Sequence, residues 1–212
     1  MVIAILIVAA YLLGSIPSAV WIGKAFYGVD VREHGSGNAG ATNTFRTLGS
    51  KAGSAVMFMD LIKGFAAVKL SLLSAFPWHS VEIVNLQVAL GLAAVVGHIF
   101  PIFAEFRGGK GIATLLGMIT GIQPLVAICL IFVFIGMLYL TQYVSLSSIT
   151  ASVAFPLLIL FIFKEPEKSY RVFAIATAVL VILTHYKNID RLLSGSESKA
   201  PFLKRKKEKR NK

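Results

Sequence analysis

The sequence predicts an all-α, polytopic membrane helix bundle of seven transmembrane helices, with the N-terminus outside the cell and the C-terminus in the cytoplasm. Of its 212 residues, 56% are hydrophobic and only 15% are charged, whereas soluble domains carry about 25% charged residues. The apolar runs are continuous and do not alternate with polar positions, which indicates membrane helices and not the strands of a barrel.

The charge distribution predicts a lipid bilayer as partner and no nucleic acid. The net charge of +11 comes mainly from loops and the C-terminus, where basic residues set topology and contact anionic lipid. The single cysteine, Cys129, lies inside an apolar run, which excludes a disulfide framework and a cysteine metal site. No metal or cofactor is expected. Residues 1–198 are expected to form one integral membrane domain, followed by a basic cytoplasmic tail, residues 199–212.

The first three predicted spans cover residues 1–23, 52–76 and 83–104. Residues 1–23 are uncharged, long enough to cross the bilayer, and lack the basic start of a signal peptide, so we expect one uncleaved helix. The second span carries Asp60 and Lys63, three positions apart and therefore on one helix face. Ionisable groups at this depth face the bundle interior; a structural ion pair and a catalytic pair both remain possible.

The number of remaining spans is inferred from the distribution of charged residues. Residues 111–163 carry no charged side chain and accommodate either two or three helices, interrupted at Pro124 and at the polar residues 141–148. A last span then ends near Tyr186. Residues 187–212 hold ten Lys or Arg against three Asp or Glu, a net charge of +7. The positive-inside rule places this tail in the cytoplasm, which requires three helices in the uncharged stretch. The polar segments then all lie on the cytoplasmic face.

A polar, glycine-rich loop at residues 33–46 is the first candidate site. Its glycines permit positive φ angles and close approach of a ligand, and successive N–H groups in such a turn bind anions. Arg46 adds a planar cation suited to phosphate. A solvated turn has a similar composition, but the density of small residues favours a phosphate site. The residues expected to bind substrate are Ser36, Gly37, Asn38, Gly40, Thr42 and Asn43.

A second glycine loop, Gly108-Gly109-Lys110-Gly111, also combines glycine with a cation. It does not match the nucleotide-binding P-loop, because Lys110 is followed by glycine and Ala104 stands where the first glycine is required. Glycine backbone and a lysine at the start of a helix still suit phosphate. We therefore expect Gly108, Gly109 and Gly111 to bind a phosphate that is not part of a nucleotide. His98, shortly before this loop, is either a functional group or simply hydrogen-bonded at a helix end.

The two loops follow similar segments. The first span contains Gly14-Ser15-Ile16-Pro17 and the third ends in Gly97-His98-Ile99-Phe100-Pro101. Each leads into a glycine-rich loop with an arginine and an Ala-Thr step, at Ala41-Thr42 and at Ala113-Thr114. A parallel repeat would place a two-loop site between symmetric halves; chance similarity is the alternative.

These segments belong to a longer pattern, which includes Ser36-Gly37-Asn38-Ala39-Gly40-Ala41-Thr42-Asn43-Thr44-Phe45-Arg46, Phe106-Arg107-Gly108-Gly109-Lys110-Gly111 and His185-x-x-Asn188-x-x-Arg191-x-x-x-Gly195-x-Glu197. With it the chain resembles the acyl-phosphate:glycerol-3-phosphate acyltransferases, bacterial membrane enzymes that begin phospholipid synthesis. The resemblance covers residues 14–197 without a departure at a motif position; only the tail beyond Lys199 lies outside it.

The resemblance implies transfer of a fatty acyl group from acyl phosphate to the 1-hydroxyl of glycerol 3-phosphate, giving lysophosphatidate and inorganic phosphate. It implies a bacterial inner-membrane enzyme, and the topology inferred from charge places its active site on the cytoplasmic face. Acyl phosphate has a good leaving group, so catalysis requires orientation and neutralisation of charge. The base is either His185 or a substrate phosphate oxygen. We predict that the reaction depends on His185, Arg46, Lys110 and Asn188, and that Ser145 faces the same groove.

Two alternatives are compatible with the sequence. His185 and Asp190 match the H-x-x-x-x-D pattern of another glycerolipid acyltransferase superfamily, but that superfamily's catalytic domain lies mostly outside the bilayer, and two residues at one spacing are a weak motif. A membrane transporter of an organic phosphate is the second alternative. A transporter places its site near the midplane with access from both faces, whereas the outer half of this chain is apolar.

Overall fold

The computed structural model describes residues 1–78 and 80–200, and within these ranges the chain is helical, without a strand. In chain order the elements are α1 (Val2–Gly14), α2 (Ser18–Tyr27), the 3-10 turn η1 (Val31–Glu33), α3 (Ala41–Thr47), α4 (Ser50–Lys69), η2 (Leu70–Leu73), α5 (Val81–Ile99), η3 (Ile102–Ala104), α6 (Ile112–Ile122), α7 (Pro124–Thr141), α8 (Val144–Leu157), the π-helical η4 (Leu158–Ile162), α9 (Lys168–Thr184) and α10 (Tyr186–Leu193).

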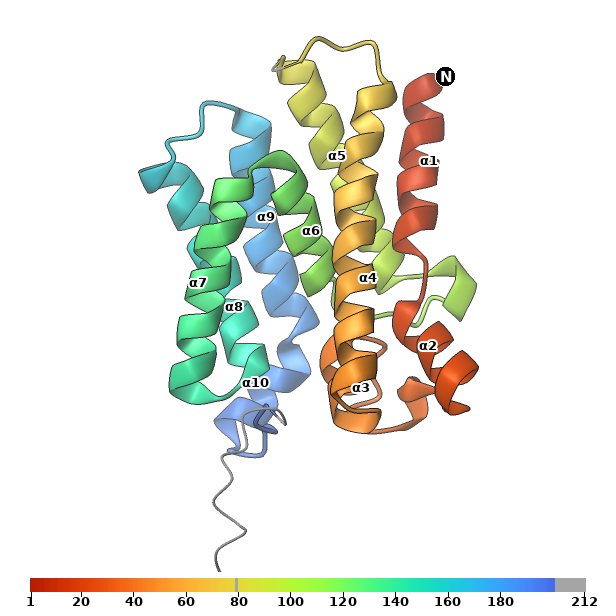
Figure 1. The fold of residues 1–212 in the computed structure, drawn as a ribbon. Helices are drawn as coiled ribbons and strands as arrows, with labels where there is room; N and C mark the ends of the chain where they lie inside the picture. The colour runs from red at the N-terminus through yellow and green to blue at the C-terminus, as the bar shows by residue number, and fades with distance from the viewer. Residues whose placement is uncertain (79, 201–212) are drawn as a thin grey trace, which may run out of the picture.

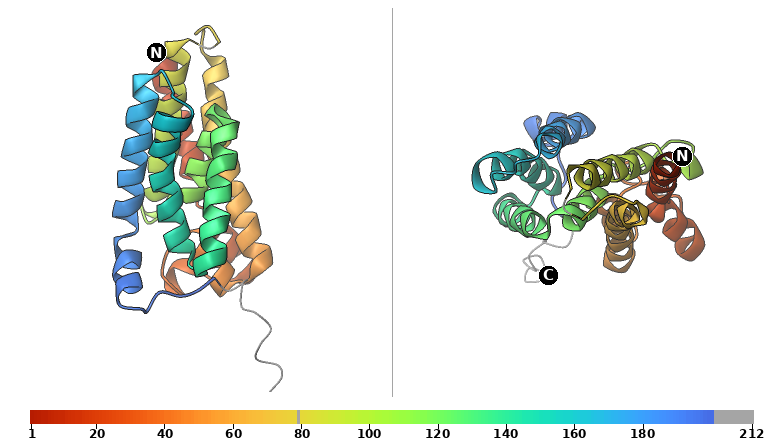
Figure 2. Two further views of the ribbon diagram at one scale, coloured as in Figure 1. Left: turned by 90° about the vertical axis from the view of Figure 1, so that its left-hand side faces the viewer. Right: turned by 90° about the horizontal axis from the view of Figure 1, so that it is seen from above.

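The long helices run up and down along one axis (Figure 1). The N-terminus lies at one end of the bundle, while α2, α3 and α10 gather at the other. Seen from above, α1, α4, α5 and α6 form one group, and α7, α8 and α9 form a second beside it (Figure 2). The groups join where α6 packs on α7 and α5 packs on α9. The core between them contains the fully buried Met118, Phe155, Tyr170 and Val181.

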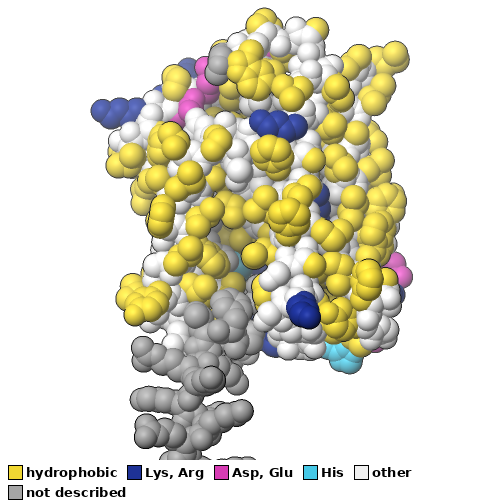
Figure 3. Space-filling view, viewed as in Figure 1, with side chains coloured by type: hydrophobic (Ala, Val, Ile, Leu, Met, Phe, Trp, Pro, Cys, Tyr) yellow, Lys and Arg dark blue, Asp and Glu magenta, His cyan; other side chains and the backbone are white. Residues whose placement is uncertain are grey.

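The length and hydrophobicity of several helices are those expected of a membrane protein. By length and composition alone, three helical segments can cross a bilayer, Val81–Ala104, Pro124–Thr141 and Val144–Ile162, and five can if each bent helix pair counts as one span. Hydrophobic side chains cover most of the face shown in Figure 3. The uncharged residues 111–163 form three helices, as predicted, although α6 is only 11 residues long.

The prediction of one continuous helix over residues 1–23 is wrong. The chain leaves the helix after Gly14 and re-enters it at Ser18, with a bend of 42° between α1 and α2. Pro17 lacks an N–H and disfavours the helical conformation of Ile16 before it, so the helix breaks at this step. The break exposes the Ile16 carbonyl and places Ser18 at the first position of α2, where both contact α4.

Helices α1 and α5 run in the same direction, as do α4 and α6 (Figure 1). In each pair, a glycine of each helix packs against the backbone of the other. A Cβ on Gly14 of α1 would collide with the backbone of Ala94 in α5, and one on Gly97 would collide with the carbonyl of Tyr11. Small residues allow membrane helices this close approach.

In the second pair, Gly64 of α4 meets the Thr114 carbonyl and Gly117 of α6 meets the Leu61 carbonyl. This arrangement agrees with the parallel repeat suggested by the sequence. The Ala-Thr steps do not correspond in it, since Ala41-Thr42 begins α3 whereas Ala113-Thr114 lies in α6, whose counterpart is α4.

Candidate active site

Lys110 connects the second glycine loop to α10. Its ammonium group donates a hydrogen bond to Oδ1 of Asn188. Burial lowers the pKa of Lys110 to about 8, with Glu197 opposing the shift and the nearby cations Arg191 and Arg46 adding to it. The structure thus brings together the loop lysine, the third motif and the cation of the first loop, all of which the sequence predicted as site residues.

Glu197 holds this group of side chains in place. Its Oε1 accepts hydrogen bonds of 2.7 Å from Asn188 Nδ2 and from Ser145 Oγ, and its Oε2 accepts one of 2.7 Å from Arg191 Nε. Burial opposes the charge of Glu197, but these three hydrogen bonds keep its pKa below the usual value. Glu197 was not among the predicted site residues, although it is the last residue of the third motif. Ser145 and Asn188, which were predicted, are both its partners.

His185 lies at the bend of 61° between α9 and α10 and is buried. Its Nδ1 is 2.8 Å from the Val181 carbonyl oxygen. A carbonyl oxygen can only accept, so Nδ1 carries the proton and Nε2 of the neutral ring is free to accept one. Asp190 is exposed on α10, and its carboxylate contacts no partner in the described part of the chain. The structure therefore contains no His185–Asp190 dyad.

The first glycine loop is shaped by Asn43, which is buried. The Asn43 side chain accepts a hydrogen bond of 2.8 Å from the Ser36 amide and donates to the carbonyls of Val31 and His34 at 2.8 and 3.0 Å. Both amide hydrogens are therefore used inside the protein. The structure gives Asn43 the role of fixing the loop, whereas the sequence suggested a direct donor to the substrate.

The rest of the first loop is open to a ligand. Ser36 and Gly37 are exposed, while Asn38, Gly40 and Thr42 are half-buried. The backbone amides of residues 38–43 donate to no acceptor within the described residues. The Arg46 guanidinium, half-buried in the last turn of α3, likewise has no acceptor there.

The second loop uses its glycines differently from the prediction. The amides of Gly108 and Gly109 donate to the carbonyls of Ile99 and His98, each at 3.1 Å, and so are not available to a substrate. A Cβ on Gly108 would collide with the His98 carbonyl, and one on Gly109 with the His98 imidazole. Gly111 adopts a φ of 80°, which favours glycine. Among the described contacts, the amides of Lys110 and Gly111 have no acceptor.

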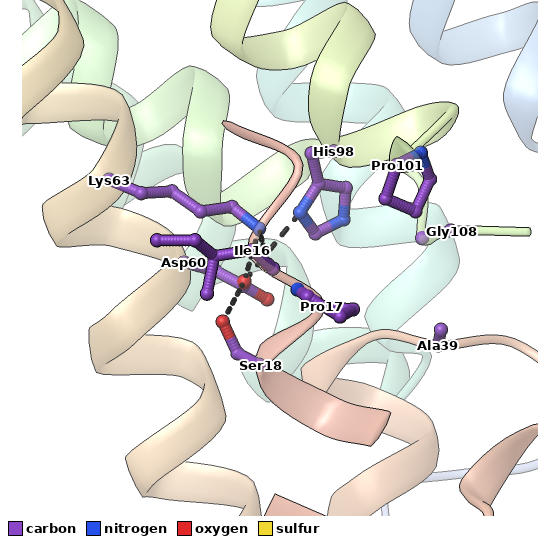
Figure 4. A pocket seen from close by; sticks show the side chains of 10 residues that line it. Ile16, Pro17, Ser18, Ala39, Asp60, Lys63, His98, Pro101 and Gly108 are labelled. Atoms are coloured by element: carbon purple, nitrogen blue, oxygen red, sulfur yellow. Dashed lines mark hydrogen bonds and ion pairs between the residues drawn. The ribbon is translucent and has the colours of Figure 1, made fainter. Parts of the chain in front are cut away.

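A buried polar cluster lies beside the two loops, next to Ala39 of the first and Gly108 of the second (Figure 4). It surrounds a cavity of about 10 Å³ lined by Ile16, Pro17, Ser18, Ala39, Asp60, Lys63, His98, Pro101, Gly108 and Gly109. Asp60 accepts from Ser18 Oγ at 2.9 Å and pairs with Lys63 at 2.8 Å. Within the described residues, no group of three His, Cys, Asp or Glu side chains is arranged to hold a metal ion.

The comparison with known families shows to which protein family the chain belongs. The family model described as glycerol-3-phosphate acyltransferase matches residues 4–195. The chain belongs to the glycerol-3-phosphate acyltransferase family. This confirms the family that the motifs indicated.

Curated members of the family are similar along nearly their whole length. The glycerol-3-phosphate acyltransferase of Fusobacterium nucleatum is 48% identical over 198 residues, covering 92% of this chain and 97% of the relative. That of Streptococcus pneumoniae is 44% identical over 209 residues, covering 95% of each.

Two crystal structures of the integral membrane glycerol 3-phosphate acyltransferase PlsY (YgiH) share the fold. The glycerol 3-phosphate form has a TM-score of 0.84 and 40% identity, and the lysophosphatidic acid form a TM-score of 0.80 and 38% identity; each covers 93% of this chain and 94% of the solved chain. The chain is thus an all-helical integral membrane protein of the glycerol-3-phosphate acyltransferase family.

Proposed function

We propose that this protein transfers a fatty acyl group from acyl phosphate to the 1-hydroxyl of glycerol 3-phosphate, producing lysophosphatidate and inorganic phosphate. Family membership supports the acyltransferase reaction. The solved PlsY forms with glycerol 3-phosphate and with lysophosphatidic acid support the acceptor and the product. In this chain, the observation that carries the proposal is the hydrogen bond from Lys110 of the second glycine loop to Asn188 of the third motif, with the positive charge of Arg46 near enough to lower the pKa of Lys110.

The cations suit two substrates that both bear phosphate. The glycerol hydroxyl oxygen bonds to the acyl carbonyl carbon, and the bond from that carbon to the phosphate oxygen then breaks, so that phosphate leaves with the bonding electrons. Lys110 and Arg46 neutralise the phosphates, since charge-assisted contacts stabilise a transition state in which charge moves to the leaving group. The free amides of residues 38–43 and of Gly111 can donate to the developing oxyanion.

The hydroxyl proton has two possible acceptors. The neutral His185 ring presents Nε2 as a base because Nδ1 is bonded to Val181. A phosphate oxygen of the substrate is the other acceptor, and the leaving phosphate can carry the proton away. In either case His185 and Asn188 hold the acceptor substrate beside Lys110, and orientation supplies a large part of the rate.

We infer a seven-span topology, with the N-terminus outside and the active site on the cytoplasmic face of a bacterial inner membrane. The N-terminus and α10 lie at opposite ends of the bundle, which supports an odd number of crossings (Figure 1). Residues 1–198 form the membrane domain, and residues 199–212 form a basic tail, of which residues 201–212 lie outside the described part. The net +7 of residues 187–212 supports a cytoplasmic C-terminus.

A direct assay tests the reaction. Purified protein receives labelled glycerol 3-phosphate with either acyl phosphate or acyl-CoA, and lysophosphatidate and inorganic phosphate are measured. We expect turnover with acyl phosphate and little with acyl-CoA. Turnover with acyl-CoA alone would refute the proposed donor, and no lysophosphatidate with either donor would refute the acyltransferase function.

A further inference from the structure

The second glycine loop rests on a buried histidine that belongs to a charged cluster. His98, in the last turn of α5, is 6% exposed, and Asp60 of α4 is 2% exposed. The His98 Nδ1 lies 3.6 Å from the Asp60 carboxylate and 3.2 Å from the Thr114 hydroxyl of α6. The Thr114 hydroxyl is thus within hydrogen-bond distance of the imidazole and the Asp60 carboxylate lies beside it, and Figure 4 shows the ring between Asp60 and the loop at Gly108.

Asp60 is held in turn by one partner at the start of α2 and one on its own helix. Ser18 Oγ donates to it from the start of α2, and Lys63, which pairs with it, also donates to the Ile16 carbonyl at 3.0 Å. The position of the carboxylate is thus fixed by the α1–α2 break and by its own helix. His98 is the member of this cluster whose backbone and ring both meet the glycine loop.

The contact between His98 and the loop is close. The His98 carbonyl accepts the Gly109 amide, and the Nε2 edge of the ring occupies the place where a Cβ of Gly109 would lie. Gly109 directly precedes Lys110, whose ammonium group binds Asn188. A displacement of the ring would therefore be transmitted to the position of Lys110 through one peptide unit.

An ordinary structural role explains this cluster poorly. Charged groups inside a membrane protein are costly, and replacing a buried ion pair by apolar side chains is often neutral or stabilising. We propose that His98, whose ring lies between the Thr114 hydroxyl and the Asp60 carboxylate on one side and Gly109 on the other, is a positioning residue for the second glycine loop, and that its ring fixes the position at which Lys110 meets the substrate phosphate. This inference rests on the proposed function for its kinetic consequences.

A double-mutant cycle tests the contact. Gly109→Ala places a methyl group against the His98 ring, so we expect a loss of about tenfold or more in kcat/KM for glycerol 3-phosphate. In a His98→Ala background the collision with the ring is removed and only a tight contact of 3.2 Å with the Ala39 carbonyl oxygen remains, so the further loss on Gly109→Ala should be only about twofold to threefold. Gly108→Ala is the matched control, because its methyl group meets the backbone of His98 and Ile99, which His98→Ala does not remove.

The outcomes separate the possible roles. Positioning predicts that His98→Ala relieves Gly109→Ala and leaves the loss from Gly108→Ala unchanged. If the losses from His98→Ala and Gly109→Ala simply multiply, His98 does not set the loop and the proposal is wrong. A purely structural role would lower the thermal midpoint of Asp60→Asn and His98→Ala while leaving KM for glycerol 3-phosphate unchanged.

A second measurement does not depend on enzyme turnover, and its variants do not remove a large buried side chain. The reactivity of the Lys110 amine is measured against pH by labelling and mass spectrometry in the wild type, in Asp60→Asn and in Thr114→Val, which removes only the hydroxyl next to His98. We expect the pH at which half of Lys110 becomes reactive to rise in both variants, because a displaced loop exposes the amine to water. An unchanged midpoint in both overturns the proposal. If the wild type shows no acyl transfer, the proposed function fails, and this labelling still decides the role of His98.

Discussion

Lys110 and Asn188 share a hydrogen bond between residues that are 78 positions apart in the chain. The bond joins the loop before α6 to the helix that follows the last long span. Arg46 lies close enough to influence Lys110 from the first loop.

Arg46 is expected to contribute to catalysis through its planar guanidinium group. Arg46→Ala should reduce kcat/KM on the order of a hundredfold or more, because it removes a charge-assisted contact that strengthens in the transition state. Arg46→Lys should recover little, since a point charge does not replace a bidentate fork. Acylation rates of purified variants measure this, with the exposed Lys51→Ala as control; an Arg46→Lys enzyme with wild-type rates would contradict the assignment.

The third motif is expected to act through His185 and Asn188 and not through Asp190. His185→Ala and Asn188→Ala should be severe, because one removes the buried ring and the other the partner of both Lys110 and Glu197. Asp190→Ala should be mild, since that carboxylate is exposed. Initial rates are compared after thermal unfolding has shown that all three variants fold. Equal inactivation by Asp190→Ala and His185→Ala would restore the dyad alternative.

The activity is expected to decline at alkaline pH because Lys110 loses its proton. Burial lowers the pKa of this amine to about 8, so the cation is present below that pH and is lost above it. Since kcat/KM reports the free enzyme, kcat/KM for glycerol 3-phosphate should fall as the pH rises through this value. The neighbouring Glu197 stays charged over this range, because its pKa lies below the usual value.

Lys110→Arg provides the control for that profile. Arginine stays protonated across the accessible range, so the alkaline decline should disappear even if the overall rate is lower. The exposed Lys51→Ala should leave the decline in place. A decline that persists unchanged in Lys110→Arg would assign it to another group.

The topology predicts which positions an impermeant thiol reagent can reach. In a Cys129→Ala background, single cysteines at Ser50 and Ser196 should be protected in intact cells, because both positions lie at the end of the bundle that carries α3 and α10 (Figure 1). A cysteine at Ala75, which is exposed in the α4–α5 connection, should be labelled. Labelling at Ser196 but not at Ser50 would indicate an even number of spans.

Much of the helix order was predictable because it follows from the hydropathy and charge of successive residues. The three helices of the uncharged stretch and the last helix near Tyr186 were confirmed. The break at Pro17 was missed, since an uncharged run of sufficient length was given more weight than the local effect of proline. Helix lengths were also not predictable in detail: α6 is short and packs against α4, where Gly64 and Gly117 permit close approach.

The candidate site was predictable as a set of motifs but not as a set of contacts. Sequence spacing cannot show that the Gly108 and Gly109 amides bind the end of α5, because a glycine loop open to phosphate has the same composition. Asn43 and Glu197 illustrate the same limit, since each fixes other site residues through side-chain hydrogen bonds that the spacing of the motifs does not reveal. The role of Asp60 remained open for a related reason: its partners come from α2 and α5 as well as from its own helix.

The ion pair of Asp60 and Lys63 has a consequence for biosynthesis. The ribosome completes α4 before α5 and α6 exist, so at that stage the carboxylate cannot meet His98 or any residue beyond it. Lys63, one turn away at 2.8 Å, neutralises the carboxylate from within the same helix, which lowers the cost of releasing α4 into lipid. His98 joins the cluster only when α5 has been inserted, and the glycine loop that rests on it is translated immediately afterwards.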